Sequence, residues 1–340
     1  MKRPLAIALL ALVASAPLPA APVVALPYYT PQHFAQGLQQ WQAARAAEFA
    51  QTSRQLAPAL QARCDGGPLE AARTAWSASV ADWERLATLA LGPLLERRSA
   101  RQIDFTPPRP ELIARAIATD AGEAATLERV GSPAKGFPAL EWLLWSEPVA
   151  AATPACRYAL ALGRDIEREA LALADTTRAA PEPDEAAGGA LLADALNQWV
   201  AGLEALRGRH LERPLRAETS SNRDPAVFPR AASGGSARSW AAQWQALRAL
   251  AVQGEAPVAR PGEGLVPFET FLRGLGLNAK ADALRAAVRR VDVALAGLEP
   301  AQRERVLAAA AALGALKRLV EDEVAPALNV SIGFSDADGD

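Results

Sequence analysis

GGPLEAARTAWSASVADWERLA, residues 66–87, carries the clearest helical pattern in this 340-residue chain. Its apolar residues recur three or four positions apart, which places them on one face of an α-helix. The segment opens with Gly66-Gly67-Pro68 and is closed near Gly92-Pro93, and both sequences are typical of helix ends. The residues on the predicted apolar face are Leu69, Ala72, Trp76, Val80, Trp83 and Ala87.

The same period recurs in four other segments, at 158–173, 240–251, 284–298 and 306–320. The first of these has Thr153 as its expected N-cap and Pro154 at the first helical position. Ala, Leu, Arg, Glu and Gln are abundant, and such residues favour helices. No segment alternates apolar and polar residues with period two. The sequence therefore predicts an all-α protein.

Breaks in the helical pattern divide the chain. A proline-rich turn is expected at 106–110, and irregular segments are expected at 216–235 and 257–267. The stretch 179–189, rich in Pro, Gly, Asp and Glu, is the best candidate for a linker. We therefore predict a first helical bundle at 28–178, a second at 190–330 and a tail at 331–340.

The N-terminus has the order of a cleavable secretory signal. Lys2 and Arg3 precede an apolar run at 5–15 and small residues at 16–21, and the run is too short to span a bilayer. Cleavage after Ala20, Ala21 or Ala25 fits the small-residue rule equally well. We assign residues 1–21 to the signal and expect a periplasmic or cell-envelope protein without a transmembrane segment in its mature chain.

Cys64 and Cys156 are the two cysteines of the chain. In an oxidising compartment an isolated pair is most simply a disulfide, and the alternative is two buried thiols. Neither cysteine has a Cys or His at the spacing of a zinc site. The formal net charge is −2 with mixed signs, which offers no basic footprint for nucleic acid.

Five segments, in order along the chain, resemble the imelysin family, also known as the M75 peptidase family. The first contains Trp76, Trp83 and Gly92-Pro93, and the second is RQID at 101–104. The third, GFPALEWLLW at 136–145, falls where the family carries its Gly-x-His-x-x-Glu signature. The last two are the Ser-rich PRAASGGSARS at 229–239 and the terminal ALNVSIGF at 327–334. The resemblance covers nearly all of the mature chain.

This resemblance implies an envelope protein with two helical bundles related by an internal duplication. It also implies a site between the bundles and a role in the uptake of iron or other metals. The peptidase label of the family fits most of its members poorly. Partners implied in this way are other envelope proteins of an iron-uptake system.

The signature departs from the family pattern at one position. Gly136 and Glu141 match it, but Pro138 stands where the family has its histidine, and proline offers no donor atom. The two histidines, His33 and His210, are not part of any other His-x-x-Glu. We therefore expect first-row divalent metals to bind poorly, whereas carboxylates alone would hold a hard cation such as Fe³⁺ or Ca²⁺ weakly. Replacing Pro138 with His should improve metal binding.

Glu141 is the first candidate site residue, because apolar neighbours at 140 and 142–145 make an unpaired carboxylate costly. The alternative reading is a first-turn glutamate stabilised by the helix dipole. Arg101 is the cation expected to pair with Glu141, and Asp104 is expected nearby. For Arg101 and Asp104 the alternative is a salt bridge at a helix end. We expect all three to meet the 236–239 segment in one cleft.

The remaining candidates come from the other matching segments. Glu84 faces either the bundle interface or solvent. Ser236 and Ser239 are suited to capping the helix that begins near Trp240, and Arg238 to binding an anion beside that helix. Asp336, Asp338 and Asp340 begin like a calcium loop, but the glycine is misplaced. We interpret them as a polar tail or a lid over the site.

These observations favour a non-enzymatic protein of metal homeostasis that binds an ion, an anion or a partner between two bundles. A metallopeptidase is the first alternative, and the missing histidine ligand argues against it. A structural or partner-docking module that has lost metal binding is the second. A catalytic serine would need a base nearby, for which a chain with two histidines offers little.

Overall fold

A computed structural model of the chain describes residues 27–119, 124–216 and 227–333. Within these ranges every regular element is helical, which confirms the all-α prediction. No helix in the described part is long and apolar enough to cross a membrane. The predicted signal and the aspartates at 336, 338 and 340 lie outside the described residues.

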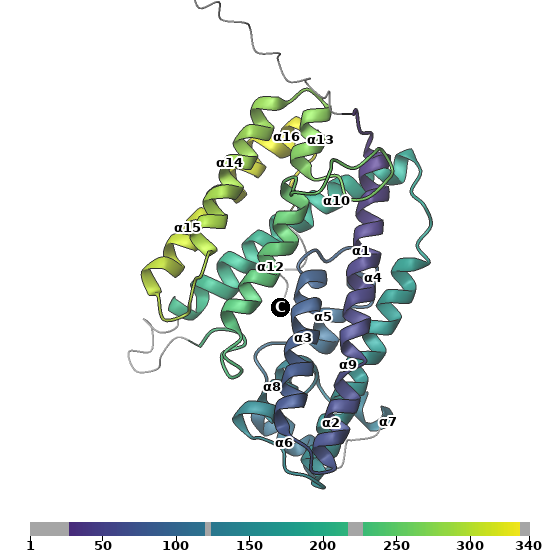
Figure 1. Ribbon diagram of the computed structural model, residues 1–340, viewed down its shortest axis with the longest axis vertical. Helices are drawn as coiled ribbons and strands as arrows, with labels where there is room; N and C mark the ends of the chain where they lie inside the picture. Colours follow the sequence, from purple (N-terminus) through teal and green to yellow (C-terminus); the bar gives the residue numbers. More distant parts are fainter. Residues whose placement is uncertain (1–26, 120–123, 217–226, 334–340) are drawn as a thin grey trace, which may run out of the picture.

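The lower bundle in Figure 1 is built around one apolar core. Its long helices are α3 and α9, and they pack with α2 and the second half of α1. Short helices close one side of it. The elements are α1 Pro31–Ser53, α2 Leu56–Cys64, α3 Leu69–Ala87, α4 Pro93–Glu96, α5 Ser99–Ile103, α6 Pro110–Ala118, α7 Ala124–Leu127, η1 Ser132–Ala134, α8 Gly136–Glu141, η2 Trp142–Ser146 and α9 Pro154–Arg178.

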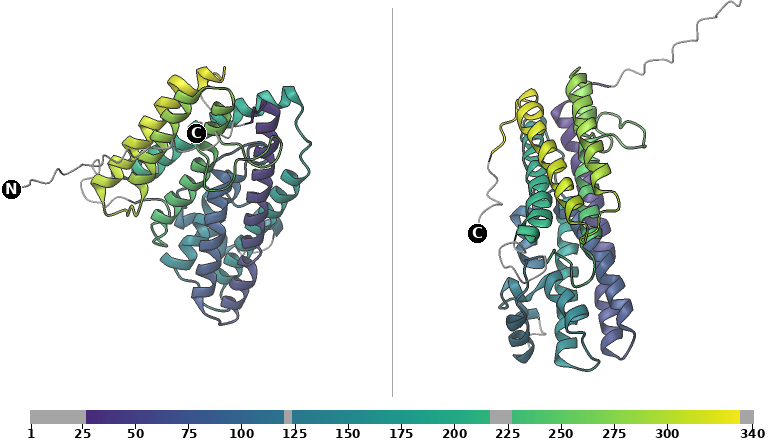
Figure 2. Two further views of the ribbon diagram at one scale, coloured as in Figure 1. Left: turned by 45° about the horizontal axis from the view of Figure 1, so that its top comes forward. Right: turned by 90° about the vertical axis from the view of Figure 1, so that its left-hand side faces the viewer.

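The upper bundle has a second core of its own. Figure 2 shows it stacked on the lower bundle along the long axis of the molecule. In it, α14 packs on α15, and α12 reaches down to α3 of the lower bundle. The elements are α10 Glu185–Glu204, η3 Ala205–Glu212, α12 Ser236–Ala251, α13 Phe268–Gly274, α14 Asn278–Leu295, α15 Arg303–Leu319, η4 Val320–Val324 and α16 Ala325–Ala327.

Helix α1 joins the two cores. Phe34 and Leu38, in its first turns, are buried in the upper core, whereas Ala46 and Phe49, two turns later, belong to the lower one. The ring of Phe34 stacks on Phe268 of α13 with centroids 5.4 Å apart. A single rigid helix therefore fixes the upper bundle relative to the lower one, and this sets the geometry of the junction between them. The internal duplication stays a prediction.

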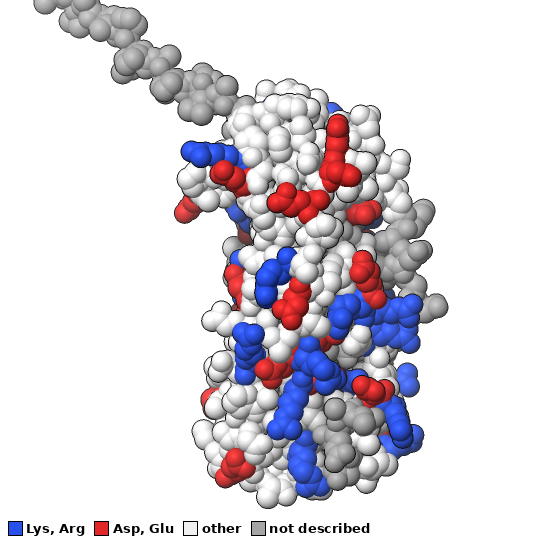
Figure 3. Space-filling view, turned by 90° about the vertical axis from the view of Figure 1, so that its right-hand side faces the viewer, with Lys and Arg blue, Asp and Glu red and all other residues white. Residues whose placement is uncertain are grey.

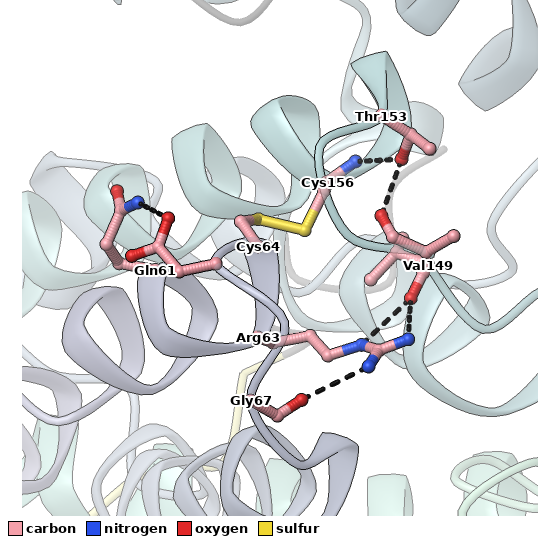
Figure 4. The surroundings of a disulfide bond; sticks show 9 residues. Gln61, Arg63, Cys64, Gly67, Val149, Thr153 and Cys156 are labelled. Atoms are coloured by element: carbon pink, nitrogen blue, oxygen red, sulfur yellow. Dashed lines mark hydrogen bonds between the residues drawn. A yellow bond between two sulfur atoms is a disulfide. The ribbon is translucent and has the colours of Figure 1, made fainter.

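The predicted disulfide between Cys64 and Cys156 is present, with 5.6 Å between the two Cα atoms. It links the end of α2 to the first turn of α9, as Figure 4 shows. Arg63 donates two hydrogen bonds to the carbonyl oxygen of Val149, at 3.0 and 2.8 Å. Thr153 is the N-cap of α9, as predicted, and its hydroxyl accepts from the backbone N–H of Cys156 at 3.2 Å.

The start of α10 differs from the sequence prediction. The expected linker at 179–189 is shorter in the structure, because α10 already begins at Glu185. Asp184 caps this helix through a 2.8 Å hydrogen bond from the N–H of Ala187. An acidic N-cap outweighs the two glycines at 188 and 189, whose low helix propensity suggested a longer break.

Candidate functional site

Three carboxylates of the lower bundle lie at its junction with the upper one. Glu84 is near the end of α3, Asp104 directly follows α5, and Glu141 ends α8. The side chains of Glu84 and Glu141 are almost completely buried, with relative exposures of 6% and 7%. The segment 227–235, which leads into α12, lies against them. We call Glu84, Asp104, Glu141, Arg230, Ser233 and Ser239 the junction site.

Gly136 explains how α8 brings Glu141 to this place. Its φ is +70°, a conformation that favours glycine. A Cβ atom on Gly136 would lie 2.1 Å from the carbonyl oxygen of Ile103, so no other residue fits without moving the backbone. The first turn of α8 therefore contacts the residue just before Asp104, and the glycine of the signature has a steric role.

A buried ion pair fixes the position of α5 and hence of Asp104. Glu169 on α9 accepts from the Nε and Nη2 atoms of Arg97, at 2.9 and 2.6 Å, and from the hydroxyl of Ser99 at 2.7 Å. Asp104 itself accepts from the indole N–H of Trp83 at 2.8 Å. Contacts within the lower bundle thus fix the position of the Asp104 carboxylate independently of the upper bundle.

Arg230 is the cation that joins the bundles. Its Nε donates to Glu84 Oε1 at 3.0 Å and its Nη2 to Asp104 Oδ1 at 2.6 Å. The guanidinium also lies over the ring of Trp76, 5.7 Å from its centroid. With a relative exposure of 5%, Arg230 is as well shielded from water as the carboxylates. Buried charges of this kind are stable only when paired and hydrogen-bonded.

Ser233 and Ser239 donate hydrogen bonds to two of these carboxylates. Ser233 donates to Glu141 Oε1 through both its backbone N–H, at 2.9 Å, and its hydroxyl, at 2.7 Å. The hydroxyl of Ser239 donates to Glu84 Oε1 at 2.8 Å. Ser236 donates to the carbonyl oxygen of Pro229 at 2.8 Å. The prediction that Ser236 and Ser239 cap α12 is wrong, because Gly235 is the N-cap and both hydroxyls have other acceptors.

Burial and neighbouring charges act on the titration of these groups. Burial raises the pKa of Glu84 above its usual value of 4.5, and Asp104 adds to this while Arg230 opposes it. For Arg230, burial acts to lower the pKa, but the attraction of Asp104, Glu84 and Glu141 outweighs burial and raises it. The guanidinium is therefore a permanent charge, and Glu84 is the junction carboxylate that protonates above its usual range.

His210 lies at the upper edge of the junction. Its Nδ1 atom is 3.2 Å from the Nε2 atom of Gln243, which also donates to Ser239 at 3.1 Å. Burial, and to a lesser extent Arg209 and Arg230, lower the pKa of His210 to about 3. The histidine is therefore neutral at physiological pH, and Gln243 separates it from the serine.

A small pocket opens beside Glu84 and Arg230. Its other lining residues include Trp76, Ser77 and Arg238, and its volume is about 20 Å³. This is room for about one water molecule. The pocket admits a water molecule or a single small ion and is too small for an organic substrate.

The structure brings together most, but not all, of the predicted site residues. Glu84, Asp104, Glu141 and Ser239 meet at the junction, and Pro138 is buried one turn before Glu141. Arg101 does not take part: it is exposed on α5, and Arg230 is the arginine that binds the carboxylates. Arg238 is exposed at the rim of the pocket. Sequence reasoning missed Arg230 and Ser233, although both stand in the quoted segment at 229–239.

Arg101 is one of several exposed basic residues of the lower bundle. The others include Arg98, Arg109, Arg115, Arg129 and Arg164. On the face drawn in Figure 3, basic side chains gather in the lower half, with acidic side chains among them. An arginine in this position is solvated, and solvation satisfies its charge without a buried partner.

The donor set does not fit a metal ion. In the described ranges no three His, Cys, Asp or Glu side chains are arranged to hold one. Pro138 contributes no ligand atom, and the guanidinium of Arg230 lies between the oxygens of Glu84 and Asp104 that a cation would use. A metal ion and this guanidinium would repel each other at such distances.

Comparison with known proteins places this geometry among relatives. A sequence model of the M75 peptidase family, described as Imelysin, matches residues 39–336. The structure of an imelysin-like protein from Psychrobacter arcticum 273-4 has a TM-score of 0.69 and 20% identity, and the alignment covers 92% of this chain and all of that one. No curated protein matches the chain.

A second solved structure shares the fold. It is that of a "putative iron-regulated protein A precursor" from Parabacteroides distasonis ATCC 8503, with a TM-score of 0.68 and 15% identity. The alignment covers 90% of this chain and 97% of that one. At these identities the two solved structures establish the architecture, whereas the sequence match over 39–336 establishes the family.

Proposed function

This chain belongs to the imelysin family, and we propose that it is an exported, non-enzymatic cell-envelope protein that serves the uptake or homeostasis of iron or another metal. The pocket at its junction site is the contact point for an anion or for a partner protein of the same system. The observation that carries this proposal is the Glu84–Arg230–Asp104 group, in which Glu84 and Arg230 are buried and which joins two bundles of a family fold without assembling a reaction centre.

The link to iron rests on relatives. The Parabacteroides distasonis protein of the same fold is named for iron regulation, and the family resemblance points the same way. The N-terminal order of charges, apolar residues and small residues supports export. Periplasmic residence would place the protein where envelope components of metal uptake act.

The site chemistry supports a role without catalysis. Hydrolysis by a serine needs a base at hydrogen-bond distance and a substrate beside the hydroxyl. Glu141 and Glu84 accept from Ser233 and Ser239, but the pocket beside Glu84 and Ser239 has room for about one water molecule and leaves no space for a substrate. The neutral His210 contacts Gln243 and not a serine. Hydrolysis by a metal needs a ligand set with an open position, which Pro138 and Arg230 oppose. A binding role uses what the junction leaves accessible, which is the small pocket lined by Glu84, Arg230 and the exposed Arg238.

The proposal is tested by deleting the gene and measuring growth and cellular iron under iron limitation. We expect a deficit that the full-length gene restores and that a version without residues 1–21 does not. A strain that grows and accumulates iron normally under every metal limitation would contradict the role. Metal analysis of the protein purified from the periplasm should find no stoichiometric zinc or iron.

Peptidase activity is the alternative that the family label raises. We expect no cleavage of peptide substrates by the purified protein, with or without added Zn²⁺. Chelator-sensitive cleavage that is abolished by Glu141→Ala would overturn the non-enzymatic assignment.

A further inference from the structure

The junction site holds a positive charge that the chain itself supplies. Glu84, Asp104 and Glu141 come from three elements of the lower bundle, and all three bind the 227–235 segment: Glu84 and Asp104 share the guanidinium of Arg230, and Glu141 accepts from Ser233. This guanidinium is bound on two edges by carboxylates and on one face by Trp76. Each of these positions is one that a free cation would occupy in an anionic site.

The charges of the site do not balance without Arg230. Two carboxylates share one permanent cation, so its removal would leave the negative charges of Glu84 and Asp104 without this salt-bridge partner. Glu84 and Glu141 are too deeply buried for bulk water to solvate their charges. An empty site of this kind would draw in a proton or a small cation.

The chain delivers Arg230 by an unusual backbone conformation. Its φ of +64° lies in the left-handed region, which non-glycine residues adopt only at an energetic cost. Gly234, at φ +63°, completes the turn. Ser233 fastens the same segment to Glu141. The contacts of the guanidinium and of Ser233 offset this cost, and they hold the segment against the lower bundle.

We propose that Arg230 is the resident cation of the junction site, a guanidinium that takes the position of an exchangeable ion and keeps the site closed to free cations. The donors around it are carboxylate oxygens, and such donors prefer hard cations or planar guanidinium groups over Zn²⁺. The site therefore takes a hard cation or a free guanidinium ion only when Arg230 is withdrawn. The proposal concerns the site and holds whether or not the protein serves iron uptake.

The test removes the cation and offers substitutes. Arg230→Ala should bind Tb³⁺ and Ca²⁺ about tenfold more tightly than the wild type, or better, in calorimetric titrations. Tb³⁺ luminescence excited through tryptophan should increase in the variant, because Trp76 and Trp83 lie beside the carboxylates. Millimolar guanidinium should raise the Tm of the variant by roughly 2–4 °C and leave that of the wild type unchanged.

Two controls isolate the charge at the junction. Arg101→Ala removes an exposed arginine that takes no part in the junction, and should change neither cation binding nor the response to guanidinium. Arg230→Gln keeps a polar side chain with part of the aliphatic stem of arginine, and we expect it to fold if Arg230→Ala does not, with the same gain in Tb³⁺ binding. The double variant Arg230→Gln/Glu84→Gln should lose that gain.

Specific results would overturn the proposal. They are Tb³⁺ binding by the wild type as tight as by the variants, or well-folded variants that respond neither to Tb³⁺ nor to guanidinium. Neither result depends on growth under iron limitation. Failure of this proposal is therefore distinguishable from failure of the proposed function.

Discussion

In the lower bundle, distant parts of the chain are tied covalently by Cys64–Cys156, which are 92 residues apart. In the upper bundle, the corresponding tie is ionic: Glu269 of α13, with a relative exposure of 1%, accepts hydrogen bonds from Arg285 of α14 and from Arg273. The backbone N–H of Gln253 also donates to it. Each bundle is thus stabilised by a tie that is complete in itself.

The junction differs from both. At Glu269 two guanidinium groups surround one carboxylate, whereas at the junction one guanidinium is shared by two carboxylates, Glu84 and Asp104. The arginines of the upper bundle are partly exposed and reach water, while Arg230 does not. A buried carboxylate with surplus cations is a structural element. At the junction, the carboxylates outnumber the cation, so the arrangement depends on Arg230 alone. This dependence on one residue is why we place function there.

The largest effect is expected from the covalent tie. Replacing Cys64 and Cys156 with serine should lower the free energy of unfolding by about 4 kcal/mol, because the bridge closes a long loop in the unfolded chain. Chemical denaturation of the double variant measures this. Retention of wild-type stability would show that the lower bundle does not depend on its disulfide.

A smaller loss is expected at the ionic tie of the upper bundle. Glu269→Gln keeps the shape but removes the charge that two guanidinium groups share, and should cost about 2–3 kcal/mol. Glu263→Gln, at a glutamate in the exposed loop before α13, is the matched control and should cost almost nothing. Equal stability of the two variants would contradict the structural role of Glu269.

His210 gives the junction a dependence on pH. Its pKa is about 3 in the folded protein against 6.5 for a free histidine, so the unfolded chain binds a proton that the folded chain rejects. Its contribution to stability is present above pH 6.5 and is lost as the pH falls, by at most about 1.4 kcal/mol per pH unit. Denaturation between pH 7 and 5 should show a steeper loss for the wild type than for His210→Gln. Parallel curves would refute this.

The smallest effect is expected at Glu84. Because its pKa is raised in the folded protein, its contribution to stability is present below the pKa of the unfolded chain and is lost as the pH rises through the folded value. Glu84→Gln should therefore be within about 1 kcal/mol of the wild type at pH 7, and should gain on it as the pH rises from 4.5. A loss of unfolding free energy as large as that for Glu269→Gln would contradict the different roles that we assign to Glu84 and Glu269.

The sequence by itself determined the long helices and the start of α9. Apolar spacing predicted α3, α9, α14 and α15, and Thr153 and Pro154 predicted the start of α9. The disulfide followed from an isolated cysteine pair in a chain that is predicted to be exported. These features depend on local periodicity, capping and composition, which are present in the sequence as it is read.

Only the tertiary structure decided which arginine pairs with which carboxylate. Arg101, three residues before Asp104, is exposed, whereas Arg230, which is 126 residues away, binds it. The same packing buries Glu84. The hydroxyls of Ser236 and Ser239 do not cap α12 and donate instead to the carbonyl oxygen of Pro229 and to Glu84. A buried charge needs a partner within hydrogen-bond distance, but the sequence does not say which of many arginines will supply it. Packing of α12 on α3 makes that choice, because it brings the 227–235 segment to the carboxylates.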